Sequence, residues 1–267
     1  MANALRDKLR AKVTRAVDEV VSRHRAEQEQ VFRDELDRLR ADLRRETERV
    51  LEFARSVELR DRRDLFAAGE RTAVAEAAAF AQAEMATARS FPNPIATLEY
   101  ALTLVGGEGM ALEFGVFTGT TLKVIASACP EREVYGFDSF DGLPEDWRLG
   151  FTAGAFHAEP PEVPGAELVV GLFSDTLPGF LREHPGPVAL LHLDADLYSS
   201  TRTVLDLVGP RLRPGSVVVF DEYFNYPGWA EHEHRAWREF VDSSGVDFRY
   251  EAYTFDNEQV VVRITGV

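Results

Sequence analysis

The stretch that decides the fold reads Leu112-Glu-Phe-Gly-Val-Phe-Thr-Gly-Thr-Thr121, an apolar run that leads into a glycine-containing turn. Gly115 and Gly119, four residues apart, allow the backbone to turn tightly against a ligand. The threonines that follow place hydroxyl groups where a helix begins. The stretch therefore predicts a strand, a ligand-binding turn and a helix, and it matches neither the dinucleotide fingerprint G-x-G-x-x-G nor a P-loop.

Strands and helices alternate from this unit to the end of the chain. Apolar runs predict strands at residues 111–116, 133–137, 167–170, 188–193, 216–220, 248–253 and 259–264. Helices are predicted at residues 95–105 and near 119–128, 176–184, 199–209 and 229–243. This order predicts an α/β fold, a Rossmann-like doubly wound sheet of seven strands that ends in an antiparallel hairpin.

The N-terminal segment follows a different pattern. Residues 1–63 contain no Pro or Gly, and apolar residues recur at coiled-coil spacing in two blocks, Leu9 to Val20 and Phe32 to Val57. We expect a long helix over 1–63, a helical connector over 64–90 and the α/β domain over 91–267. A lone helix cannot bury such a stripe, so we expect a homo-oligomer or a docked partner; a solvated, partly frayed helix is the alternative.

Charge and composition limit the possible partners. Residues 1–63 hold 17 Lys and Arg against 14 Asp and Glu, whereas the remaining residues hold 13 against 31. Such an acidic body disfavours nucleic acid and anionic membranes and attracts cations. The chain has no run of 18 uncharged apolar residues and no signal-peptide pattern, so we expect a cytoplasmic protein. Cys129 is the one cysteine and is interpreted as a buried structural thiol.

Acidic residues end three of the predicted strands. Asp138 lies 19 residues after Gly119, where a carboxylate can accept hydrogen bonds from ribose hydroxyls, so a nucleoside site is predicted for either a methyl donor or NAD. Asp194-Ala-Asp196 and Asp221-Glu222 follow two apolar strands, and such dense acids indicate an oxygen-ligand site for Mg²⁺. The alternative is that they cap the following helices or are solvated. His192, inside an apolar strand, is interpreted as a core residue.

These motifs resemble a known family. E-F-G-V-x-x-G, G-F-D-S-F-D-G-L-P, L-H-L-D-A-D-L-Y-x-S-T and V-F-D-E-Y, in this order, look like the macrocin O-methyltransferase family of class I methyltransferases, which modify sugars of natural products. The resemblance covers about 175 residues and implies S-adenosylmethionine (SAM) as methyl donor and Mg²⁺ as a second cofactor. It also implies residue roles, which place SAM at Glu113, Gly115, Phe117, Thr118, Gly119, Thr120, Asp138, Ser139, Phe173, Ser174 and Asp194.

The same resemblance assigns the metal and the base. The metal ligands would be Asp194, Asp221 and Glu222, where the family usually has Asp-Asp in place of Asp221-Glu222. Asp196 would be the general base. Apart from the resemblance, His232 or His234 is a second base candidate because both follow the strand that ends at Asp221, although an amphipathic helix start with exposed histidines explains them equally well. We expect an O-methyltransferase that acts on a small hydroxylated acceptor, such as a sugar or a glycosylated natural product. The alternatives are a SAM-binding scaffold protein assembled through its coiled coil and, less consistent with the motifs, a nicotinamide oxidoreductase.

Overall fold

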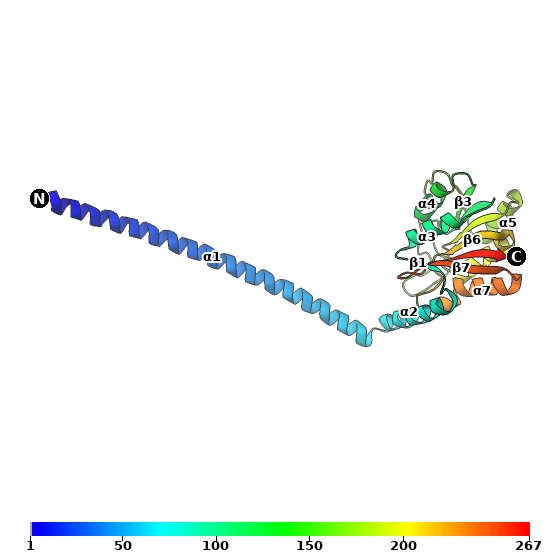
Figure 1. Cartoon of the computed structure of the whole chain (residues 1–267), viewed down its shortest axis with the longest axis horizontal. Coiled ribbons are helices and arrows are strands. Elements are labelled where there is room, and N and C mark those ends of the chain that lie inside the picture. The colour runs from blue at the N-terminus through cyan, green and yellow to red at the C-terminus, as the bar shows by residue number, and fades with distance from the viewer. Residues whose placement is uncertain (1) are drawn as a thin grey trace. The chain divides into compact units, whose positions relative to one another are not determined.

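The structure, a computed structural model, describes residues 2–267, with side chains described for residue 6 and from residue 8 onward. Its contacts divide the chain into two units, Met1–Ala67 and Ala68–Val267. Most of the first unit is α1 (Ala2–Arg63), one continuous helix of 62 residues (Figure 1). The predicted long N-terminal helix is therefore confirmed, whereas its coiled-coil pairing stays a prediction. No helix in the described part of the chain is both long and apolar enough to span a membrane.

The apolar stripe of α1 is open to solvent. Apart from the partly buried Leu36, its large apolar side chains from Leu9 to Leu59 expose between 49% and 70% of their surface. Charged side chains pair along the helix at spacings of three or four residues, as Arg33 does with Glu29 and Arg40 with Asp37. Such exposed pairs support a helix only weakly, so the stripe, rather than the charges, is the feature of α1 that calls for burial.

The second unit is built on one sheet of eight strands in the order β1-β7-β8-β6-β5-β2-β3-β4. The strands are β1 (Arg89–Phe91), β2 (Met110–Phe114), β3 (Val134–Asp138), β4 (Glu167–Val170), β5 (Val188–Leu193), β6 (Leu212–Phe220), β7 (Asp247–Thr254) and β8 (Val260–Gly266). All seven predicted strands are present. The expected count of seven is corrected to eight, because β1 adds a short parallel edge beside β7.

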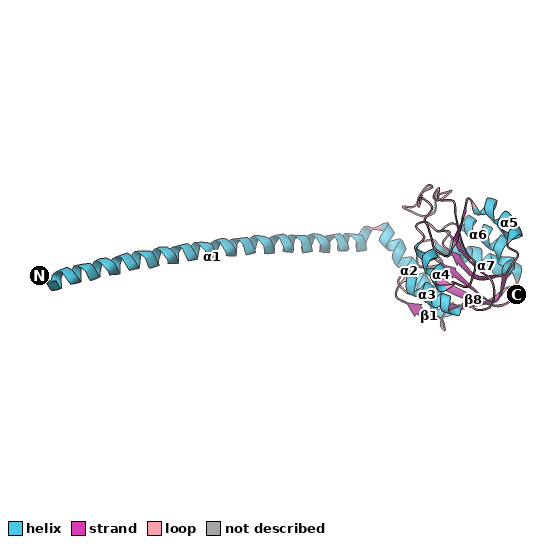
Figure 2. Ribbon diagram, turned by 90° about the horizontal axis from the view of Figure 1, so that it is seen from above, coloured by secondary structure: helices cyan, strands magenta, loops and turns pink. Residues whose placement is uncertain are grey.

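Helices cover both faces of the sheet, as Figure 2 shows. They are α2 (Leu65–Glu84), α3 (Pro94–Leu104), α4 (Thr120–Ala128), α5 (Phe173–Glu183), α6 (Tyr198–Val208) and α7 (Glu233–Ser244), with short 3-10 turns η1 (Gly209–Arg211) and η2 (Trp229–Glu231). Apolar residues of α3 and α4 pack in one core layer, and those of α2, α5, α6 and α7 pack in the other. The doubly wound α/β fold predicted from the sequence is therefore confirmed.

The central strands explain where a ligand can bind. Every residue of β2 and of β5 is buried, as expected for strands covered by helices on both faces. After β2 the chain builds the sheet outward through β3 and β4, and after β5 it builds the other side through β6. The sheet order therefore reverses between β2 and β5. Ligands of doubly wound folds bind beside such a reversal, at the carboxyl ends of the strands.

Candidate active site

A cavity of about 510 Å³ opens at the carboxyl ends of these strands. Nine of the predicted site residues line it: Gly115, Phe117, Asp138, Ser139, Phe173, Ser174, Asp194, Asp196 and Glu222. Five other predicted residues, together with the metal-ligand candidate Asp221, are absent from this lining: Glu113, Thr118, Gly119, Thr120 and His232. The structure thus gathers most of the candidate residues, which lie up to 107 positions apart in the chain, at one edge of the sheet.

The glycine turn is held against the strand that carries the acidic motif. Gly115 has a φ of 92°, and a Cβ built there would lie 1.7 Å from the carbonyl oxygen of Asp194. No side chain fits in that space, so glycine is required at this position. Gly119, with a φ of 74°, is the N-cap of α4. The turn therefore runs directly beside the backbone of Asp194.

Asp138 shapes this turn as well as facing the cavity. Its Oδ2 accepts hydrogen bonds from the backbone N–H groups of Val116 and Phe117 at 2.8 and 2.9 Å, and its Oδ1 accepts one from Phe140 at 2.7 Å. Each carboxylate oxygen can accept a second bond, so the group can still bind a ribose hydroxyl. The acid at the end of β3 therefore both fixes the glycine turn and remains available to a ligand.

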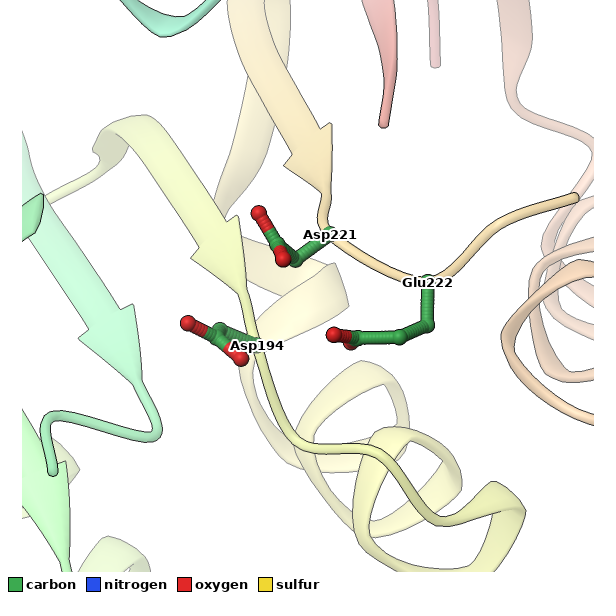
Figure 3. Close-up of side chains that lie close together, drawn as sticks. All are labelled: Asp194, Asp221 and Glu222. Carbon is green, nitrogen blue, oxygen red and sulfur yellow. The ribbon is translucent and has the colours of Figure 1, made fainter. Parts of the chain in front are cut away.

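Three carboxylates converge at the ends of β5 and β6. Asp194, Asp221 and Glu222 each offer an oxygen, and these oxygens lie within 4.8 Å of one another (Figure 3). One oxygen of Glu222 is buried without a hydrogen-bond partner. Like charges so close repel unless a cation or a proton is shared among them. Since carboxylate oxygens are the ligands that Mg²⁺ prefers, the donor set fits such an ion.

Burial and mutual repulsion raise the pKa values of two of these carboxyl groups, Asp194 and Glu222. The pKa of Asp194 lies well above the usual aspartate value because of burial first and the charges of Asp221 and Asp196 next. Burial is also the main cause of the raised pKa of Glu222. A bound cation would favour the ionised forms and offset both effects. The electrostatics therefore agree with the geometry of a cation site.

A second layer of buried side chains holds the carboxylates in place. Glu113 does not reach the cavity but pairs with His192, whose Nδ1 lies 2.9 Å from its Oε1, and the other ring nitrogen lies 4.0 Å from Asp221. Burial lowers the pKa of His192, but the bond to Glu113 and the nearby negative charges raise it overall. Gln259 donates from Nε2 to the carbonyl oxygen and to Oδ2 of Asp221, both at 3.1 Å. The expectation that His192 is a core residue agrees with its burial.

Glu233 is a further buried acid that sequence reasoning missed. It is fully buried in the first turn of α7, where its Oε2 accepts a hydrogen bond of 3.1 Å from the backbone N–H of Glu222. Thr201 Oγ1 donates to its other oxygen at 3.4 Å. Glu233 therefore orients the segment that carries Glu222. A single acid in an amphipathic helix carries no signal of such a role.

The backbone of Asp196 has an unusual conformation. Its φ of 60° is left-handed, a conformation that costs a non-glycine residue about 1–2 kcal/mol. Burial raises its pKa to about 7, although the charge of Arg148 acts in the opposite direction. A carboxyl group with a pKa near neutrality, on a cavity wall, has the properties of a general base.

His232, the other predicted catalytic residue, lies away from the cavity wall. Its ring packs against Tyr226, with 5.9 Å between ring centroids, and burial lowers its pKa. Burial also lowers the pKa of His234, to about 4, within a cluster that includes Phe80 and Trp229. The packing interpretation of these histidines fits their contacts, and the catalytic role of His232 stays a prediction.

Comparison with known proteins shows which proteins this chain resembles. A family model described as a methyltransferase domain matches residues 112–223, which include the glycine turn and all four acids after β5 and β6. A tetracenomycin-C sugar 4'-O-methyltransferase from Streptomyces olivaceus is 30% identical over 155 residues, 47% of this chain and 58% of that protein. Residues 112–223 are therefore similar to known methyltransferase domains. The chain spans a little over half the length of this relative.

Solved structures show the same similarity. The calicheamicin methyltransferase CalS11 is 27% identical to this chain, with a TM-score of 0.55 over 63% of this chain and 77% of that one. The O-methyltransferase NovP, at 21% identity and a TM-score of 0.51, covers 64% of this chain and 79% of its own. The second likeness supports the fold alone. Together with the sequence relative, these similarities confirm the resemblance to natural-product O-methyltransferases.

Proposed function

We propose that this protein transfers a methyl group from SAM to a hydroxyl group of a sugar or glycosylated natural product, with Mg²⁺ as a second cofactor. The observation that carries the proposal is the convergence of Asp194, Asp221 and Glu222 beside a cavity that the glycine turn and Asp196 line. The sugar O-methyltransferase from Streptomyces olivaceus supports the class of acceptor.

In this proposal, SAM and the metal ion are held by different groups of residues around the cavity. The glycine turn, Asp138 and Ser139 hold the methionine and ribose parts of SAM, and the segment around Phe173 and Ser174 holds the adenine. The three convergent carboxylates hold the metal. When bound, SAM would supply the methyl group, and Mg²⁺ would lower the pKa of an acceptor hydroxyl.

Asp196 then removes the proton of the acceptor hydroxyl. Its pKa of about 7 leaves much of the group ionised near neutral pH, as a base requires. Its burial, with 9% of its surface exposed, keeps bulk water from competing for that proton. Glu233 and Gln259 contribute by orienting Glu222 and Asp221. The residues of this chain thus position the acceptor oxygen and accept its proton, which is what an in-line displacement at a methyl group needs.

Calorimetric titration of SAM into the full-length protein, with Mg²⁺ and then with EDTA, tests the proposal. We expect SAM to bind while NAD, as control, does not, and we expect a separate Mg²⁺ heat that Asp221→Asn removes. Asp242→Asn, an exposed aspartate of α7, is the matched control and should retain the heat. Absence of SAM binding under both conditions contradicts the methyltransferase proposal. An unchanged Mg²⁺ heat in Asp221→Asn contradicts the metal site alone.

We further propose that α1 joins copies of this chain into a homo-oligomer. The stripe on α1 is exposed along its length, and burying it between helices is the standard way to stabilise such a pattern. Replacing Leu39, Leu43 and Val50 together by lysine should reduce the molar mass that sedimentation measures to that of one chain. Replacing Arg38, Arg44 and Arg55 by lysine is the matched control and should leave it unchanged. Equal masses for both triple variants would rule out assembly through the stripe.

A further inference from the structure

The charges of the residues that line the cavity limit the charge of the acceptors that can enter it. Among the described residues that line the cavity, Asp138, Asp194, Asp196 and Glu222 are acidic, and Arg148 is the one basic residue. A divalent ion held by Asp194, Asp221 and Glu222 would offset two of their three charges at most. The acceptor therefore meets a surface that repels anions.

Arg148 does not change this balance, because its charge is already compensated. Its Nη1 lies 2.9 Å from both carboxylate oxygens of Glu258, in a pair whose side chains expose only 24% and 18% of their surface. Its guanidinium group also lies over the rings of Trp147 and Tyr226, 4.0 and 4.5 Å from their centroids. Phosphate groups are normally bound by arginine or lysine side chains that are free to pair with them. The cavity wall offers no such cation.

Aromatic rings form a continuous row along another part of the wall. Phe117, from the glycine turn, meets Phe156 edge to face with centroids 5.8 Å apart. Phe156 stacks on Phe151 at 5.3 Å, and Phe151 in turn lies 5.3 Å from Trp147. All four rings line the cavity. The last three belong to the connection between β3 and β4, so two separate segments build the row.

Two rings of this row are both exposed and held on unfavourable backbone. Phe117 exposes 43% of its surface and Phe156 exposes 38%. Their φ values are 46° and 64°, in the left-handed region that bulky residues avoid. Solvent exposure of a phenylalanine ring does not offset the free-energy cost of a left-handed backbone. Backbone strain of this kind is concentrated at sites that bind ligands. The two rings are therefore suited to contact a flat, apolar ligand group.

We propose that the acceptor carries an aromatic or flat apolar group and no phosphate, so that the enzyme methylates sugars after their attachment to an aglycone rather than as nucleotide-linked sugars. The aglycone stacks on Phe156 and Phe151 while the sugar hydroxyl lies near Asp196. This inference rests on the proposed function. It also places the enzyme in a reaction order, since a glycosyl transfer must supply its substrate.

The test measures binding to the full-length protein saturated with S-adenosylhomocysteine and Mg²⁺. The probes are p-nitrophenyl glycosides of a panel of hexoses and deoxyhexoses, the methyl glycosides of the same sugars, and the corresponding thymidine-diphosphate sugars. We expect at least one p-nitrophenyl glycoside to bind about fivefold to tenfold more tightly than its methyl glycoside, the effect of an added aromatic contact. We expect no binding of the diphosphate sugars at concentrations where that glycoside saturates.

Variants separate the two parts of the proposal. Phe156→Ala should reduce the affinity for the p-nitrophenyl glycoside to that of the methyl glycoside, whereas Phe255→Ala, an exposed phenylalanine outside the cavity, should not. Glu258→Gln removes the compensating charge from Arg148 and should create measurable diphosphate-sugar binding. Glu251→Gln, which breaks the surface pair with Arg249, is its matched control and should not.

Each outcome decides the proposal. It is overturned if a diphosphate sugar binds the unaltered protein more tightly than every p-nitrophenyl glycoside, and loss of that binding in Arg148→Gln would assign the phosphate to Arg148. It is also overturned if no p-nitrophenyl glycoside of the panel binds, or if Phe156→Ala binds the aromatic glycoside normally. Failure of S-adenosylhomocysteine itself to bind is a different result, because it would contradict the proposed methyltransferase function.

Discussion

Charged side chains are numerous in both α1 and the cavity, but their surroundings are opposite. On α1, acids such as Asp37 and Glu29 pair with arginines in solvent, with side chains at least 60% exposed. In the cavity, Asp194 and Glu222 face other acids, and burial raises their pKa values. A solvent-exposed charge hardly changes the free energy of folding, and pairing it with an opposite charge stabilises the fold only slightly. A buried cluster of like charges destabilises the fold strongly. The destabilising cluster of buried acids, rather than the exposed pairs on α1, is therefore the arrangement that indicates function.

The largest expected effect comes from changing the acid with the least favourable backbone. Asp196→Asn keeps the size of the side chain, and asparagine tolerates the left-handed backbone, but the amide cannot accept a proton. We expect the rate of methyl transfer, measured with isotopically labelled SAM, to fall about 10²-fold to 10⁴-fold. SAM affinity should be retained. A rate within tenfold of the unaltered enzyme would remove Asp196 from the role of base.

The next effect is the dependence of the reaction on pH. Because the pKa of Asp196 is raised to about 7, the group is protonated and inactive as a base below that pH. We expect kcat/KM to rise about tenfold per pH unit below this value and to level off above it. Higher Mg²⁺ concentrations should move the inflection to lower pH, because a nearby cation favours the carboxylate. An inflection that persists in residual Asp196→Asn activity would assign the titration to another group.

A smaller effect concerns the free energy of unfolding. Ionisation of a buried acid with a raised pKa lowers the stability of the fold, whereas ionisation of an acid paired with a cation raises it. The raised pKa of Asp194 means that its ionised form opposes folding, so the penalty is absent at pH values below its unfolded-state pKa and develops as pH rises through the folded-state pKa. We expect Asp194→Asn to raise stability at pH 8 in EDTA by about 1–2 kcal/mol, the gain typical of relieving a functional site.

Thermal unfolding of the two proteins with and without Mg²⁺ measures this change. The unaltered protein should gain thermal stability when Mg²⁺ is added, and Asp194→Asn should not. The difference between the two proteins in EDTA should disappear near pH 3.5, where the aspartate is largely protonated in both states. Lower stability of the variant at pH 8 in EDTA would show that Asp194 makes a stabilising contact without a metal.

The smallest expected effect is on α1. Arg40→Gln breaks the pair with Asp37, whose atoms lie 3.2 Å apart with side chains 68% and 74% exposed. We expect the midpoint of helix melting, followed by circular dichroism, to change by less than about 1 °C. A larger change would show that another chain covers Arg40 in the assembled protein. The charges of α1 would then be less exposed, and more like the buried acids of the cavity, than the single chain shows.

The sequence predicted those parts of the fold that have a regular pattern. Buried strands such as β5 read as apolar runs, and the parallel arrangement brings their final acids to one edge, so the grouping of Asp194 with Asp221 could be foreseen. The continuity of α1 up to Arg63 could also be foreseen, since residues 2–63 contain no Pro or Gly. β1 could not, because its three residues, Arg89–Phe91, carry no alternation and pair with a strand far along the chain.

Other parts of the site depend on contacts that no local pattern encodes. Arg148 and Glu258 are 110 residues apart, and Gln259 reaches Asp221 across 38 residues. Three of the four rings of the aromatic row lie in an irregular connection without helical or strand periodicity. Glu113 was expected at the ligand, but an acid in a buried strand can also turn toward a neighbouring strand, as it does toward His192. Tertiary packing decides between these orientations.

The fit of Gly115 against the carbonyl oxygen of Asp194 has a thermodynamic consequence. Because the glycine turn and the acidic strand cannot shift independently, SAM and Mg²⁺ bound as proposed would share one rigid edge, through which the binding of one ligand can affect the other. If Mg²⁺ changes the dissociation constant of SAM by some factor, SAM must change the dissociation constant of Mg²⁺ by the same factor. The missing side chain at position 115 would thereby provide a route for cooperativity between the two proposed cofactors.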